Sequence, residues 1–253
     1  MHKTVSPVNS TLTAMLDRVR IILVCPSHPG NIGSAARAMK TMGLTRLYLV
    51  TPKSFPHAEA TALAVGAADI LDAASVCDTL DEALTGTIFS IASTARHRDL
   101  SHQIWSPREV ASSLMRKTDE GDVAIVFGPE RTGLTIQDAT KCNVVSTIPC
   151  NADYSSLNLA QAVQVFAYEL KVISLDHVIL PDDGKLVARA THEETERLIA
   201  HFEKVLIDVG FLNLKTPGRV MQRLRRLIAR GELEKDELNI LRGFLSAVEK
   251  KAL

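Results

Sequence analysis

The chain has 253 residues, of which 46% are hydrophobic and 23% charged, and its formal net charge is zero. This length allows one sizeable core plus a smaller appended module. No stretch approaches the roughly 18 uninterrupted apolar residues of a membrane helix, so we expect a soluble protein. The four cysteines (Cys25, Cys77, Cys142 and Cys150) form no CxxC pair and the eight histidines have no metal-ligand spacing, so no disulfide or metal site is predicted.

The first 14 residues, MHKTVSPVNSTLTA, are polar and lack the apolar core of a secretory signal. This pattern predicts a cytoplasmic protein. Residues 1–17 are expected to form a flexible arm, with Met15 as an alternative start of the chain.

Residues 18–178 alternate short apolar runs with helical patterns. Strands are predicted at VRIILV from Val19, RLYLV from Arg46, VCD, TIFSIAST from Thr87, VAIVFG from Val123 and VVSTIP from Val144. Helices are predicted at GNIGSAARAMKTM, capped near Asn31 or Ser34 and ended by Gly43, at ATALAVGAADIL from Ala60, at LDEALTG, at SPREVASSLMR, at IQDATKC, and from about Ser155 to Ser174. This order predicts an α/β domain with a mostly parallel sheet and helices on both faces.

Beyond this domain, Pro, Asp and Gly interrupt the pattern in residues 179–190, which predicts a linker. Residues 191–253 then contain three amphipathic helical patterns, HEETERLIAHFEKVLIDVG, TPGRVMQRLRRLIARG and EKDELNILRGFLSAVEKKAL. We therefore expect a small all-α C-terminal extension.

The second helix of this extension is strongly basic although the whole chain is neutral. No acidic residue interrupts the set Lys215, Arg219, Arg223, Arg225, Arg226 and Arg230. Such a face suits phosphate groups, so Arg219, Arg223, Arg225 and Arg226 are predicted to bind RNA. The alternative is a solvated helix face balanced by the acidic ELEKDEL that follows.

Three loops at the carboxyl ends of strands carry unusual residues, and ligands collect at that edge of parallel sheets. In the first loop, SHPGNIGSAAR, Gly30 and Gly33 permit close backbone approach, Asn31 offers an amide, and Arg37 lies on the first turns of the helix. The loop matches neither a Walker loop nor GxGxxG. The alternative is an ordinary strand-to-helix turn.

The second loop, FGPERTGLT, places Glu130 and Arg131 side by side in a turn made rigid by Pro129. A surface salt bridge is its alternative interpretation. The third, IPCNADYSSLNLAQAV, brings Ser155, Ser156 and Asn158 to the start of an apolar helix, together with Asn151 and Tyr154. One serine is expected to cap that helix, but a cap does not require both serines and Asn158.

The order of NIGSAAR, FGPERTGL and YSSLNLAQAV resembles the three signature motifs of the SPOUT methyltransferases, over about Val19 to Leu170. Within that class, SHPGNIGSAARAMKTMGL, STARHR, FGPERTGLT and NADYSSLNLAQAVQVFAYEL are similar to the TrmJ-type enzymes. The resemblance implies a C-terminal trefoil knot, S-adenosylmethionine as cofactor, a homodimer, and 2′-O-methylation of a tRNA at cytidine or uridine 32 of the anticodon loop. The same reaction on ribosomal RNA or at another tRNA position is the alternative.

The resemblance also implies roles for individual residues. Arg37, Ser156 and Asn158 correspond to catalytic positions, and Asn31, Glu130 and Arg131 are assigned to RNA binding. The implied cofactor contacts are Ser93, Thr94, Ala95, Gly128, Ile148, Ser155, Ser156 and Leu157. Because a guanidinium is a poor proton acceptor, Arg37 is expected to stabilise the developing alkoxide while Ser156 and Asn158 orient the ribose hydroxyl.

Two other classes of function are less consistent with the sequence. A non-catalytic RNA-binding protein of the same fold is disfavoured because Arg37, Ser156 and Asn158 are all present. A nucleotide-dependent dehydrogenase is disfavoured because no dinucleotide fingerprint follows any predicted strand.

Overall fold

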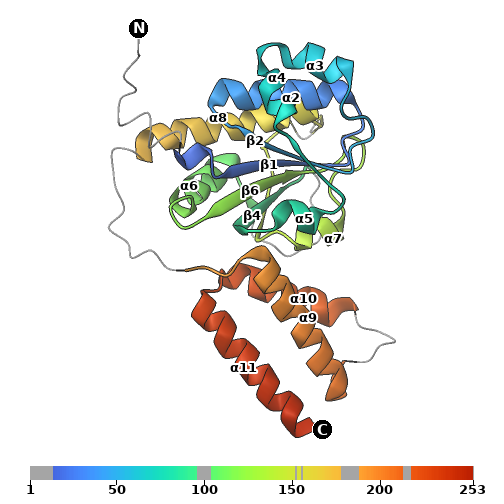
Figure 1. Cartoon of the computed structure of the whole chain (residues 1–253), viewed down its shortest axis with the longest axis vertical. Helices are drawn as coiled ribbons and strands as arrows, with labels where there is room; N and C mark the ends of the chain where they lie inside the picture. The colour runs from blue at the N-terminus through green and yellow to red at the C-terminus, as the bar shows by residue number, and fades with distance from the viewer. Residues whose placement is uncertain are drawn as a thin grey trace.

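The computed structural model describes residues 14–95, 104–151, 153–154, 156–177, 188–212 and 218–252. Residues 14–177 form a sheet domain, and residues 188–252 form a helical extension beside it (Figure 1). The elements in chain order are β1 (Val19–Val24), α2 (Pro29–Met42), β2 (Arg46–Val50), α3 (Ala58–Ala64), η1 (Val65–Ala67), α4 (Ala68–Asp72), β3 (Ser75–Cys77), α5 (Leu80–Leu84), β4 (Thr87–Ser93), β5 (Ile104–Trp105), α6 (Pro107–Lys117), β6 (Asp122–Phe127), α7 (Ile136–Thr140), β7 (Val144–Ser146), α8 (Leu159–His177), α9 (His192–Asp208), α10 (Gly218–Gly231) and α11 (Lys235–Ala252).

The sheet has seven strands in the order β3-β2-β1-β6-β4-β7-β5. Every pairing between neighbouring strands is parallel, and β1 lies between β2 and β6. All six predicted strands are present, and the predicted α/β class with a parallel sheet is confirmed. The additional strand, β5, is two residues long and pairs with β7 through Ile104 and Val145. So short a run has no periodicity that sequence analysis can detect.

The core lies on both faces of the sheet because successive strand side chains point in opposite directions. In β1, Ile21 and Leu23 pack in the cluster that contains the buried residues of α2, α6 and α8. Ile22 and Val24 of the same strand pack in a second cluster with residues of α5 and α7. All six residues of β1 are buried, as expected for a central parallel strand covered on both faces.

Three predicted helix boundaries were wrong. Helix α2 begins at Pro29, because the Nδ1 atom of His28 accepts a hydrogen bond from the Gly30 amide at 3.3 Å and caps the helix. Helix α8 begins at Leu159, because the Asn158 side chain accepts a hydrogen bond from the Ala160 amide at 2.8 Å. The helix predicted from Ala60 is broken into α3, η1 and α4, with Val65 at a φ of +54°.

Two predicted domain boundaries also shift. Met15 and Leu16, assigned to the flexible arm, are 7% and 2% exposed and belong to the core of the sheet domain. Ala190, assigned to the linker, is buried in the extension, and its amide donates to the Leu233 carbonyl at 2.8 Å. Residues 1–13 and 178–187 lie outside the described part of the chain.

Helices α9, α10 and α11 share a core of their own. Its buried apolar residues are Ala190, Leu198, Ile199, Val205, Ile228, Leu238 and Leu245. This core is separate from the two clusters of the sheet domain. Among the described residues, no helix is long and apolar enough to span a membrane.

Gly33 makes a close helix contact possible, and this contact can be tested. A Cβ atom there would lie 2.0 Å from the Ala60 carbonyl oxygen of α3, whereas a Cβ on Gly66 meets nothing within 4 Å. We expect Gly33→Ala to destabilise the fold by at least about 2 kcal/mol, because backbone must move to admit the methyl group. Gly66→Ala is the control and should leave the unfolding midpoint unchanged or slightly raised. Equal urea midpoints for the two variants would contradict this packing.

Candidate active site

The loop between β1 and α2 is held by its own helix cap and by α3. His28 caps α2, and the Cβ positions of Gly30 and Gly33 are occupied by atoms of α3 residues, Leu63 and Ala60. The predicted close approach at these two glycines is thus made by another helix of the same chain, α3. Asn31, one residue after Gly30, has its amide directed at the second loop.

Glu130, in the loop between β6 and α7, joins the second loop to the first. Its carboxylate accepts hydrogen bonds from the Ser27 amide at 3.0 Å, the Ser27 hydroxyl at 2.6 Å, the His28 amide at 3.4 Å and Asn31 Nδ2 at 2.8 Å. Partial burial raises the pKa of Glu130, but the bonds from Asn31 and Ser27 outweigh it and lower the pKa from 4.5 to about 2. Glu130 is thus a partly buried anion that joins two loops.

Asn31 extends this connection to the third loop. Its Oδ1 atom accepts a hydrogen bond from Nδ2 of Asn158 at 2.8 Å, and Oδ1 of Asn158 accepts from the Ala160 amide. Because an ionised carboxylate can only accept, Glu130 determines which end of the Asn31 amide faces it, and Asn31 then determines the orientation of Asn158. The three loops are linked by one directed chain of hydrogen bonds, from Asn158 to Asn31 to Glu130, which we call the amide relay.

A cavity opens beside the amide relay, at the carboxyl ends of β4 and β6. It holds about 930 Å³ of space including its open mouth, within the range of small-molecule sites. Its lining includes seven of the predicted cofactor residues, Ser93, Thr94, Ala95, Gly128, Ile148, Ser156 and Leu157. The eighth, Ser155, lies outside the described residues. The assignment of these residues to a cofactor stays a prediction, but they do share one cavity.

One wall of the cavity depends on Gly128. A Cβ atom at this position would lie 2.2 Å from the Leu134 backbone nitrogen, because the loop folds back on itself. The fold-back is closed by a hydrogen bond from the Gly133 amide to the Pro129 carbonyl at 2.8 Å, with Gly133 at a φ of +66°. Arg131 lies on the cavity lining and is exposed.

Cys150 lines this cavity and was not singled out by sequence analysis. It lies within the IPCNADYSSLN segment, but nothing in its spacing separates a cavity residue from a loop residue. Tyr154, which the sequence analysis did name, is 80% exposed and is not among the residues that line the cavity. Among the described residues, no group of three or more His, Cys, Asp or Glu side chains is arranged to hold a metal ion.

Arg37 is exposed on α2, further along the helix than Asn31, and it is not among the residues that line the cavity. Of the other two predicted catalytic residues, Ser156 lines the cavity, whereas Asn158 lies outside the lining and is connected to Asn31 by the amide relay. The three predicted catalytic residues are therefore not gathered in one cavity lining.

The basic helix of the extension is only partly exposed. Arg223 and Arg230 are exposed, whereas Arg225 is paired with Glu196 of α9 and its side chain is 23% exposed. Arg225 therefore neutralises a carboxylate of a neighbouring helix, and its assignment to RNA binding stays a prediction. Arg226 is half-buried, and the side chain of Arg219 lies outside the described part.

Known protein families and relatives match most of this chain. The sequence model of the SpoU rRNA methylase family matches residues 18–168, and the chain belongs to this family. The C-terminal domain of tRNA methyltransferase TrmJ matches residues 193–253. The chain is 46% identical to the tRNA (cytidine/uridine-2′-O-)-methyltransferase TrmJ of Yersinia pestis (strain Pestoides F), over 94% of this chain and 93% of that protein.

Two further relatives extend the comparison. The tRNA (cytidine/uridine/adenosine-2′-O-)-methyltransferase TrmJ of Pseudomonas aeruginosa (strain UCBPP-PA14) is also 46% identical, over 94% of this chain and 96% of that protein. The crystal structure of TrmJ from Z. mobilis ZM4 superposes with a TM-score of 0.80 at 36% identity, covering 91% of this chain and 98% of that chain. The predicted resemblance to TrmJ-type methyltransferases is confirmed.

The amide relay makes a prediction about stability and pH. Glu130→Gln replaces an acceptor by a donor that faces Ser27, so we expect a loss of about 1–2 kcal/mol at pH 7. Because the folded pKa of about 2 lies below 4.5, ionised Glu130 stabilises the fold above pH 4.5, and this contribution is lost as the pH falls from 4.5 towards 2. The difference between wild type and Glu130→Gln in urea unfolding should therefore shrink over that range. Glu203→Gln, at an exposed position, is the control, and a pH-independent difference for Glu130→Gln would contradict the relay.

Proposed function

We propose that this protein transfers a methyl group from S-adenosylmethionine to the ribose 2′-hydroxyl of nucleotide 32, a cytidine or uridine, in the anticodon loop of a tRNA. The observation that supports this most directly is the convergence of the three motif loops on one cavity through the amide relay. Membership of the SpoU family and the names of the relatives support the class of reaction. A tRNA substrate places the reaction in the cytoplasm. Position 32 rests on the sequence resemblance alone.

The cavity has the composition that this cofactor requires. Ser93, Thr94 and Ala95 offer backbone and hydroxyl groups at the end of β4, while Ile148 and Leu157 offer apolar contacts for a nucleoside. When bound, S-adenosylmethionine supplies an electrophilic methyl group on a sulfonium. Alignment of the ribose oxygen with that methyl group then lowers the barrier by several kcal/mol, in the usual range for positioning effects.

In this proposal, Ser156 and Asn158 orient the ribose. Ser156 lines the cavity, and its hydroxyl is able to donate to or accept from the substrate hydroxyl. Asn158 donates one amide N–H to Asn31 and accepts from the Ala160 amide, which leaves its second N–H for the ribose oxygen. Asn31 and Glu130 act through this geometry, so their assignment to direct RNA contact is replaced by a positioning role.

Arg37 completes the site from a second copy of the chain in this proposal. Its exposure on α2, away from the cavity of its own chain, supports a contribution across a homodimer interface. A guanidinium retains its proton at neutral pH, so Arg37 stabilises the developing alkoxide and an adjacent phosphate and does not act as a base.

We also propose that the C-terminal part of the sheet domain forms the trefoil knot that the family resemblance implies. The contacts of α8 with α2 and α6 are compatible with it.

Arg37 provides a test of this mechanism. We expect Arg37→Lys, which keeps the charge but loses the planar fork, to reduce single-turnover methylation at least tenfold while the Kd for S-adenosylmethionine changes less than twofold. Near-normal turnover in Arg37→Ala would remove Arg37 from the mechanism.

Mixed dimers of two inactive variants test whether the site is shared between subunits. Subunits with Arg37→Ala and subunits with Ser156→Ala should regain activity when they are mixed, because one of the two sites in a mixed dimer is intact. A monomer in sedimentation at working concentration would contradict the homodimer.

We propose that the exposed arginines of α10 bind the phosphates of tRNA. Arg223 and Arg230 lie two turns apart, and both are exposed. The zero net charge of the chain does not oppose this, because the field near an RNA phosphate depends on the nearest charges. Arg225 is left out of this surface because it is paired with Glu196.

Salt dependence tests this surface. The double variant Arg223→Gln and Arg230→Gln should weaken tRNA binding and lower the slope of log K against log salt by about one unit for each phosphate that is no longer neutralised. S-adenosylmethionine binding should be unchanged. A variant with Arg242→Gln and Lys235→Gln, exposed residues of α11, carries the same change of charge and should keep the wild-type slope. Equal slopes for the two double variants would exclude α10 as the phosphate-binding surface.

A further inference from the structure

The extension meets the sheet domain through polar contacts. At one end, His192 Nε2 lies 3.0 Å from Asp81 Oδ1, and the Gly86 amide donates to the Glu193 carboxylate at 2.9 Å. At the other end, Lys117 of α6 pairs with Glu232. No described hydrophobic cluster includes residues of both parts. A contact of this kind constrains orientation through the geometry of a few hydrogen bonds.

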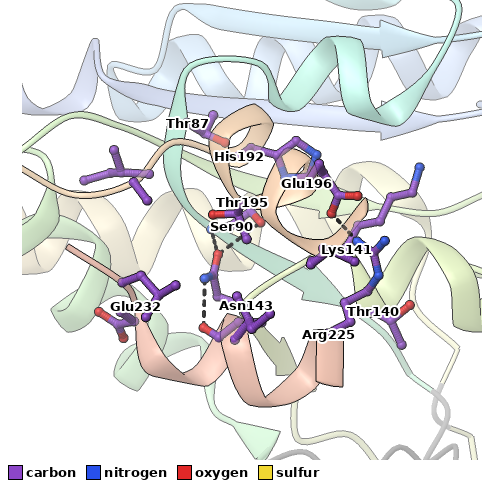
Figure 2. A pocket seen from close by; sticks show the side chains of 16 residues that line it. Thr87, Ser90, Thr140, Lys141, Asn143, His192, Thr195, Glu196, Arg225 and Glu232 are labelled. Atoms are coloured by element: carbon purple, nitrogen blue, oxygen red, sulfur yellow. Dashed lines mark hydrogen bonds and ion pairs between the residues drawn. The ribbon is translucent and has the colours of Figure 1, made fainter. Parts of the chain in front are cut away.

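Asn143 lies between these two ends, in a small polar cavity that separates the extension from the sheet domain (Figure 2). Its Oδ1 atom accepts a hydrogen bond from the Ser90 amide at 2.9 Å, and its Nδ2 atom donates to the Ala229 carbonyl at 3.0 Å. Its own amide donates to the Ser90 carbonyl at 2.9 Å. One side chain thus joins β4 of the sheet domain to the backbone of α10.

Strands β4 and β7, which meet at Asn143, both lead to the cavity beside the motif loops. Ser90 is three residues before Ser93 on β4, and Asn143 immediately precedes β7, which is followed by Ile148. Ser93 and Ile148 line that cavity. Asn143 therefore links α10 to β4 and β7, and the loops that follow these two strands form part of the candidate active site.

Helix α10 carries the exposed arginines. Its N-terminal end lies on the same side of the molecule as the carboxyl ends of the strands (Figure 1). Glu232 directly follows the C-terminal end of α10 and adopts a φ of +44°. Its carbonyl oxygen accepts a hydrogen bond from Arg189 Nη1 at 3.0 Å, which holds this end of the helix. A non-glycine residue in this conformation requires compensating contacts, and its carboxylate has them in Lys117 and Arg189. The helix is held at its end and at Asn143.

We propose that Asn143 is a positioning residue for the RNA substrate, which holds α10 in a defined place relative to the sheet domain. RNA bound to the arginines of α10 is then presented to the active site in one register. The proposal rests on the function proposed above. Asn143 does not line the cavity with the motif loops, so its effect should appear in the use of tRNA and not in cofactor binding.

Asn143→Asp isolates the bond to α10. Aspartate keeps the acceptor for the Ser90 amide and places a carboxylate oxygen against the Ala229 carbonyl, where a donor is required. Asn239→Asp, at an exposed position of α11, is the matched control with the same change of charge. The measurements are steady-state methylation of tRNA, calorimetric titration with S-adenosylmethionine, and thermal unfolding.

We expect Asn143→Asp to raise the KM for tRNA about tenfold, with kcat at saturating tRNA and the Kd for S-adenosylmethionine within twofold of wild type. Asn239→Asp should match wild type in all three. A KM equal to that of Asn239→Asp would overturn the proposal, as would a parallel loss of cofactor binding. If Asn143→Asp does not fold, Glu232→Gln, which weakens the contact with Lys117, carries the same expectations. Failure of the wild-type protein to methylate tRNA would instead refute the proposed function.

Discussion

The carboxylate of Glu130 is the interaction on which the candidate site depends. It receives four hydrogen bonds from the first loop, and these bonds lower its pKa to about 2, so it is ionised throughout the physiological range. Because a carboxylate only accepts, it sets the direction of the Asn31 amide and, through it, of Asn158. A single fixed charge thereby orients side chains from three loops that are distant in sequence.

The residues implied by the family resemblance fall into two groups according to their position relative to the cavity. Ser156 and the described cofactor residues share one cavity, and Asn158 is joined to it through the amide relay. Arg37 is on an exposed helix surface outside the cavity lining. The position of Arg37 outside the cavity lining of its own chain is the observation on which the proposal of a site shared between two chains rests. Asn31 is bonded to Glu130 and Asn158, and Glu130 accepts from Ser27 and His28 as well as from Asn31. Orientation is therefore the role that their geometry supports.

The extension follows a different physical principle. Its three helices bury their own apolar residues, and the contacts with the sheet domain are hydrogen bonds and ion pairs such as Lys117 with Glu232. Hydrophobic burial is non-directional, whereas hydrogen bonds require particular angles and distances. A helical unit attached in this way has its own apolar core, and its orientation depends on a small number of polar side chains, among them Asn143.

The sequence by itself determined the alternation of strands and helices, the three loops and the family, because apolar periodicity and motif spacing are local properties. Only the tertiary structure decided where α2 and α8 begin, that β5 exists, that Gly33 faces α3, and that Arg225 pairs with Glu196. Each of these depends on a partner that lies elsewhere in the chain. The charge of Arg225 is visible in the sequence, but the carboxylate that neutralises it is brought to it only by folding.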